Sequence, residues 1–124
     1  MATTLAYLAA ALVGLWGLAH AIPTRQVVAG FAPVTPDNRR IILQEWLAEA
    51  LTMWGLAALV IASTAVTGSG AAATQWVYRV VAGLLIALAI LTILTGARTR
   101  VIWFKICPVL LTSSAALLLI AGSM

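Results

Sequence analysis

Two acidic residues, Glu45 and Glu49, lie one helical turn apart at the start of an apolar run that extends from Leu47 to Val66. Ionisable groups at membrane depth are costly, and they usually face a partner or a water-filled cavity. Residues four apart are neighbours on one face of a helix, so the two carboxylates repel each other unless a cation or a shared proton intervenes. We therefore expect a ligand- or proton-binding site at Glu49, with Glu45 as its more hydrated neighbour.

Lys105 is the predicted cationic partner of Glu49, because each residue lies near the start of an apolar stretch that follows a basic loop. His20 approaches the same level from the first apolar stretch, and Trp16 is one turn deeper on the same helix face. We predict that His20, Glu45, Glu49 and Lys105 surround one polar vestibule. The predicted lip of this vestibule is formed by Arg39, Arg98 and Arg100.

A structural interpretation of these residues stays open beside the functional one. Ion pairing of Glu45 and Glu49 with Lys105 would stabilise a helix bundle without any chemistry. A charged residue within a membrane helix is a reason to look for a function, but it does not by itself demonstrate one. His20 would then be a polar helix end. The lysine and the arginines would anchor the helices to lipid head groups.

Other kinds of reactive site find little support. Cys107 is the single cysteine, which excludes an internal disulfide and a CxxC redox pair, and we expect its thiol to be unreactive in apolar surroundings. The Glu-x-x-His repeats of carboxylate metal centres and the paired Cys or His of zinc sites are absent from the sequence, as are phosphate loops and nucleophile elbows. We expect no metal and no catalytic residue, and we predict no cofactor, with a quinone kept open as the alternative.

The composition indicates that the helices carrying these side chains lie in a membrane. Hydrophobic residues make up 64% of the 124 residues and charged ones 8%, a balance that would leave a soluble domain with large exposed apolar patches. Each of four apolar stretches approaches the roughly 20 residues that a spanning helix needs. We predict an all-α integral membrane four-helix bundle, a single transmembrane domain over residues 1–124, with spans at about 4–22, 41–66, 75–95 and 101–122.

The loops differ in charge, and this difference predicts the orientation. The first and third loops hold Arg25, Arg39, Arg40, Arg98 and Arg100, whereas the second loop, 67–74, holds no charged residue. Positive residues favour the cytoplasm, so both termini should lie on the outer side. The net charge of +4 fits anionic lipid, and no basic-aromatic motif for nucleic acid is present.

The first loop, 23–36, is expected to lie along the membrane interface. Pro23 ends the first helix, and Val27, Val28 and Phe31 offer apolar contacts with the membrane surface. The end of this loop predicts the start of a helix, with Thr35 as the N-cap and Pro36 at the first helical position. The second helix should therefore extend from about Pro36 to Val66.

Features in the first half of the chain resemble the DoxX-like group of small four-helix bacterial membrane proteins. The resemblance rests on the order of His20, Pro23, Phe31, Pro33, Glu49 and Gly55. It implies a multi-pass protein of the prokaryotic plasma membrane that acts as a membrane subunit or accessory factor, in some members linked to quinone or sulfur redox chemistry. The second half of the chain, including Lys105 and Cys107, does not take part in the resemblance.

Three functions follow from these features. The leading one is a non-catalytic or accessory membrane subunit with a polar vestibule at its cytoplasmic side. The first alternative is a dimeric proton-coupled transporter of small solutes that uses Glu49, and the second is a membrane enzyme acting on a quinone or a lipid head group. Four short helices enclose little volume, so we expect a homo-oligomer or membrane partner subunits.

Overall fold

The computed structural model describes residues 1–31 and 33–124, and the described residues form helices and no strand. The elements are α1 (Ala2–Ala21), α2 (Thr24–Ala29), α3 (Pro36–Thr67), α4 (Ala72–Leu94), the 3₁₀ turn η1 (Gly96–Arg98) and α5 (Ile102–Ala121). Four of them, α1, α3, α4 and α5, are long and apolar enough to cross a membrane. The predicted all-α class and the four predicted spans are confirmed at this level.

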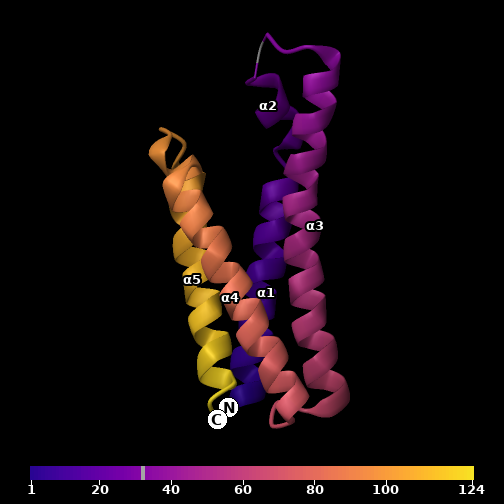
Figure 1. Ribbon diagram of the computed structural model, residues 1–124, viewed down its shortest axis with the longest axis vertical. Helices are drawn as coiled ribbons and strands as arrows, with labels where there is room; N and C mark the ends of the chain where they lie inside the picture. The colour runs from indigo at the N-terminus through magenta and orange to yellow at the C-terminus, as the bar shows by residue number, and fades with distance from the viewer. Residues whose placement is uncertain (32) are drawn as a thin grey trace.

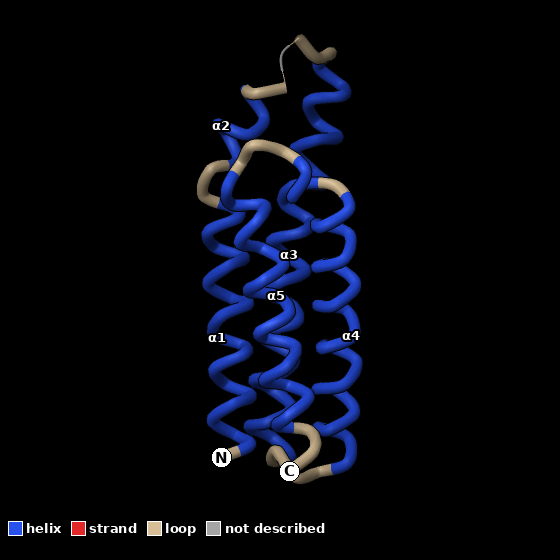
Figure 2. Tube along the Cα trace, turned by 90° about the vertical axis from the view of Figure 1, so that its left-hand side faces the viewer, coloured by secondary structure: helices blue, strands red, loops and turns tan. Residues whose placement is uncertain are grey.

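The four long helices form two pairs, α1 with α3 and α4 with α5, which are connected by contacts between α1 and α5 and between α3 and α4. Both chain termini lie at the same end as the turn between α3 and α4 (Figures 1 and 2). A hydrogen bond of 3.0 Å between the Thr3 and Ser69 hydroxyls joins α1 to that turn. We call this the terminal end, and the opposite end, with the segments 22–31, 33–35 and 95–101, the basic end.

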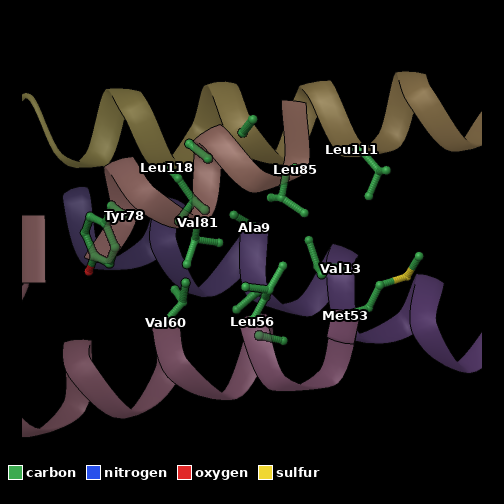
Figure 3. Close-up of a cluster of buried hydrophobic side chains, with 14 of the residues drawn as sticks. Ala9, Val13, Met53, Leu56, Val60, Tyr78, Val81, Leu85, Leu111 and Leu118 are labelled. Carbon is green, nitrogen blue, oxygen red and sulfur yellow. The ribbon is translucent and has the colours of Figure 1, made fainter. Parts of the chain in front are cut away.

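The two helix pairs lie close together near the terminal end and diverge toward the basic end (Figure 1). The buried core occupies the part where the pairs are in contact. Its side chains come from all four long helices (Figure 3): Ala9 and Val13 from α1, Met53, Leu56 and Val60 from α3, Tyr78, Val81 and Leu85 from α4, and Leu111 and Leu118 from α5. The helices are therefore packed together toward the terminal end and are separated at the basic end.

Small residues allow α1 and α3 to approach closely. Ala6, Ala9 and Ala10 are buried on α1. At Gly17 a β-carbon would come within 2.8 Å of the Trp54 indole nitrogen and 3.1 Å of the Met53 β-carbon. The Trp54 indole N–H donates a hydrogen bond of 3.1 Å to the carbonyl oxygen of Gly14, so α3 docks directly on the backbone of α1.

The outer surface of the bundle is apolar. Large hydrophobic side chains are exposed on each long helix, among them Leu15, Leu51, Ile90 and Val109. Within the most apolar window of each span, between 28% and 39% of the residues are buried inside the protein. Such a surface requires lipid or another apolar partner, and it fits the multi-pass membrane class.

The start of α3 agrees with its sequence signals. Thr35 is the N-cap, its hydroxyl accepts a hydrogen bond of 3.2 Å from the Asn38 N–H, and Pro36 is the first helical residue. The helix ends at Thr67, before Gly68, whose φ of 80° favours glycine. The predicted helix from Pro36 to about Val66 is therefore confirmed.

The preceding segment is more ordered than the loop predicted over 23–36. Its first part forms the short helix α2, which begins directly after Pro23 and packs on α3 with Val28 buried. Proline is well suited to the start of a helix because its φ angle is already near the helical value. Phe31 is exposed, as an interfacial side chain would be, and Ala32 lies outside the described residues.

Candidate functional site

A cleft of about 910 Å³ opens at the basic end, where the helix pairs diverge. Residues of all four long helices and of α2 line it, and most of its surface is apolar. Known small-molecule sites are mostly apolar concavities of roughly 300–1,000 Å³ with a few polar groups, and the cleft falls within this range. Its polar groups therefore decide what it can bind.

His20 and Glu49 form the central polar contact of the cleft. The His20 Nε2 and Glu49 Oε2 atoms lie 3.5 Å apart and connect α1 to α3. The His20 side chain is 8% exposed and that of Glu49 is 35% exposed. Among the described residues, His20 Nε2 has no hydrogen-bond partner, although it is fully buried. A buried polar atom without a partner costs about 1–3 kcal/mol, which suggests that something outside the chain completes this contact.

Trp46 holds the His20 ring in place. The two rings are stacked, with centroids 3.9 Å apart and planes inclined by 17°. The Trp46 indole N–H also donates a hydrogen bond of 3.0 Å to the His20 carbonyl oxygen. On α5, Phe104 lies nearly perpendicular to Trp46 at a centroid distance of 6.1 Å, so aromatic contacts extend across the cleft from α1 to α5.

A second contact between α1 and α5 lies deeper in the cleft wall. The Trp16 indole N–H donates to the Cys107 sulfur at 3.2 Å, and Cys107 is buried. Thr52 and Thr92 also line the cleft, and the hydroxyl of each donates to the carbonyl oxygen four residues earlier in its own helix. Their oxygen lone pairs are left as acceptors for a bound molecule.

The predicted ion pair between Glu49 and Lys105 is wrong. Among the described residues, ion pairs form between His20 and Glu49 and between Asp37 and Arg40. Lys105 is exposed and does not line the cleft, whereas Cys107, two residues further along α5, does. Residues two apart on a helix point to different sides, and α5 is rotated so that the Cys107 side faces α1.

The structure brings three of the four residues of the predicted vestibule to one cleft and leaves Lys105 outside it. His20, Glu45 and Glu49 line the cleft together, and Glu45 is exposed, as expected for the more hydrated acid. The three arginines expected at its lip, Arg39, Arg98 and Arg100, are exposed at the basic end but do not line the cleft.

Sequence reasoning missed the aromatic lining of the cleft. Trp46, Trp103 and Phe104 line it together with Trp16. The first two were open to interpretation as membrane-interface aromatics, which are common at helix ends. The available signal was the helical spacing of Trp46 and Glu49, which are three residues apart and therefore share a face.

The charges of the cleft are acidic. None of the seven lysines and arginines, all of which the structure describes, contributes to the lining, whereas both glutamates do. The described residues contain no group of three or more His, Cys, Asp or Glu that could hold a metal ion. The arrangement can hold a proton between His20 and Glu49 or bind a small molecule that presents donors to them.

Comparisons with protein-family models, with curated proteins and with solved structures find no match to this chain. The DoxX-like resemblance of the first half therefore stays a prediction, and the function rests on the geometry of the cleft.

Proposed function

We propose that this protein is a non-catalytic binding or accessory subunit of a cell membrane, and that the cleft at its basic end holds a small amphipathic molecule. Four apolar helices support the membrane location. The apolar walls would accept the body of the ligand, and His20 and Glu49 would bind its polar group.

One observation carries this proposal. His20 lines an open cleft, and its Nε2 atom is buried and lacks a hydrogen-bond partner among the described residues, although it lies 3.5 Å from Glu49 Oε2. If the histidine and the glutamate served stability alone, we would expect a closed contact with a well-formed hydrogen bond. An open cleft beside an unpartnered atom favours a bound ligand.

The proposed orientation places the basic end in the cytoplasm and both termini outside. Arg25, Arg39, Arg40, Arg98 and Arg100 flank the spans at that end, where anionic head groups and the positive-inside rule favour them. The terminal end carries Arg79, which lies over the Trp76 ring at 5.2 Å and donates to the Gly122 carbonyl oxygen. The ligand would then enter from the cytoplasm or from the inner leaflet.

Filling the cleft tests the proposed function. Thr92 lines the cleft on α4, whereas Ile90 on the same helix is 52% exposed and does not line it. Native mass spectrometry of protein released from its membrane should show a retained small molecule in the unchanged protein and in Ile90→Trp, but not in Thr92→Trp. Equal retention by the two variants would contradict a ligand in the cleft.

A proton-coupled carrier is the second candidate, and it is favoured by the one-sided opening of the cleft. The buried core closes the bundle toward the terminal end, as one state of an alternating-access cycle requires. Glu49 would bind either a proton or the solute, with a homodimer or partner subunit completing the path. Proton flux into vesicles containing Glu49→Gln should then fall relative to the unchanged protein and to Asp37→Asn, and equal flux would exclude this candidate.

A further inference from the structure

We propose that the cleft binds a protonated aromatic amine, that is, an apolar ring system carrying an ammonium group with N–H donors. The proposal rests on the proposed function, because it names the chemical class of the ligand for the same cleft.

The charge distribution excludes an anion and favours a cation. Glu45 and Glu49 line the cleft, while the lysine and arginine side chains of the described chain lie outside the lining. Inside a partly desolvated cleft two carboxylates repel an anionic group strongly, since electrostatic interactions strengthen as the effective dielectric constant falls. A cation reduces the repulsion between acids that are one turn apart on α3.

The contact between His20 and Glu49 leaves acceptors that an ammonium group can use. Their nearest polar atoms are 3.5 Å apart, and the pair does not form a hydrogen bond in this geometry. Charge-assisted hydrogen bonds from nitrogen are about 2.7–2.9 Å long, so an ammonium group in the cleft can donate to the partly exposed Glu49 carboxylate, and it reaches the buried His20 Nε2 when the imidazole ring turns toward the cleft. His20 accepts such a bond when its ring is neutral and carries its proton on Nδ1. A quaternary ammonium has no N–H for this contact.

The walls beside the acids favour an aromatic body. Trp16, Trp103 and Phe104 line the cleft, and Trp46 stacks with one ring face on His20. Aromatic faces attract cations within about 6 Å and pack well against other rings. A protonated aromatic amine uses both properties of the lining.

The exposed arginines at the basic end do not remove this preference. Arg39, Arg98 and Arg100 are outside the cleft, where solvent and phosphate head groups screen them within about 8–10 Å. Glu49 lies in the cleft itself, with two thirds of its side chain covered. Glu49 is therefore nearer to the bound ammonium group and less screened than the arginines, so its charge dominates the affinity for that group.

The test compares 2-(1-naphthyl)ethylamine, which is protonated at neutral pH, with the neutral 2-(1-naphthyl)ethanol, in equilibrium dialysis against the full chain in lipid nanodiscs. Empty nanodiscs give the lipid partitioning to be subtracted. The unchanged protein should bind the amine at least about tenfold more tightly than the alcohol. Equal dissociation constants for the two compounds would overturn the proposal without the use of any variant.

Glu49→Gln and Asp37→Asn form a matched pair, since each removes one carboxylate. Asp37 lies outside the cleft, and its side chain is 84% exposed and paired with Arg40. Glu49→Gln should weaken amine binding by about tenfold or more and leave alcohol binding nearly unchanged, whereas Asp37→Asn should change neither by more than about twofold. Equal effects of the two substitutions on the amine would overturn the proposal.

The outcomes separate this inference from the proposed function. Tighter binding of the alcohol than of the amine would overturn the proposal that the ligand is an amine. The proposed function would then remain, with a neutral ligand, such as a quinone head group, in the same cleft. Retention of the same native ligand by Thr92→Trp would show that the cleft is not the ligand-binding site and would contradict the proposed function. If Glu49→Gln does not fold, Glu45→Gln gives a second test, in which a weakening of amine binding of about threefold is expected.

Discussion

The imidazole of His20 contacts both the carboxylate of Glu49 and the indole of Trp46, two residues that are three positions apart on α3. One side chain of α1 thus contacts a charge and an aromatic face of the neighbouring helix at the same time. The contact lies where the helix pairs diverge, so it stabilises α1 against α3 on the wall of the cleft. Its energy should therefore be measurable in stability as well as in binding.

Replacing His20 by alanine should lower the free energy of unfolding by about 1–3 kcal/mol, because the loss of the stack on Trp46 and of the buried ring outweighs the removal of the unpartnered Nε2 atom. Lys105→Ala is the control on α5, outside the cleft, and it should change the free energy of unfolding by less than about 0.5 kcal/mol, since Lys105 is exposed and forms no ion pair with the described residues. Unfolding in mixed detergent micelles, followed by circular dichroism, measures both. A larger loss of unfolding free energy for Lys105→Ala than for His20→Ala would contradict this assignment of the contacts.

The buried hydroxyl of Tyr78 gives a second stability test, at the terminal end. It lies 2.6 Å from the Thr64 hydroxyl, which also donates to the Val60 carbonyl oxygen, so Tyr78 is the donor in this pair. Tyr78→Phe should cost about 1 kcal/mol of unfolding free energy. Thr64→Val should cost more, about 1–3 kcal/mol, because it leaves the tyrosine hydroxyl buried without its acceptor.

A double-mutant cycle identifies the Tyr78 and Thr64 contact itself. The double variant should be less destabilised than the sum of the single variants, since removing both partners leaves no unpaired donor. Additive losses would show that the two hydroxyls do not depend on each other.

The helices and the common level of His20 and Glu49 could be predicted from the sequence because both depend on local signals. Apolar length, the Thr35 cap and the following proline define α3, and depth along the helices brings His20 and Glu49 to one level. The partner of Glu49 could not be predicted in this way. Whether Lys105 or Cys107 faces the cleft depends on the rotation of α5 about its axis, which the packing against α1 and α4 decides.

The same limit applies to the aromatic lining. An indole near a helix end is equally compatible with the membrane interface and with a cleft wall. For Trp46 the choice follows from contacts with His20 and Phe104, which are far away in the sequence. Long-range contacts of this kind are not encoded in a local pattern.

Gly17 lies where α1 packs tightly against Met53 and Trp54 of α3, and the position should tolerate no side chain. A β-carbon there would lie 2.8 Å from the Trp54 indole nitrogen and 3.1 Å from the Met53 β-carbon. Gly17→Ala should therefore destabilise the protein by about 1–3 kcal/mol through overpacking. Gly55→Ala is the control within α3, because nothing lies within 4 Å of its added carbon, and it should be neutral or slightly stabilising. Equal unfolding curves for the two variants would contradict the close packing.

The proposed orientation predicts which engineered cysteines a membrane-impermeant maleimide reaches in intact bacterial cells. Ser123 is exposed at the terminal end, and Thr99 is exposed between Arg98 and Arg100 at the basic end. Ser123→Cys should be labelled from outside, whereas Thr99→Cys should react only after the membrane is permeabilised, because positive loops remain in the cytoplasm. The unchanged chain is the control, since its single cysteine, Cys107, is buried within α5. Labelling of Thr99→Cys in intact cells would invert the orientation and place the mouth of the cleft outside.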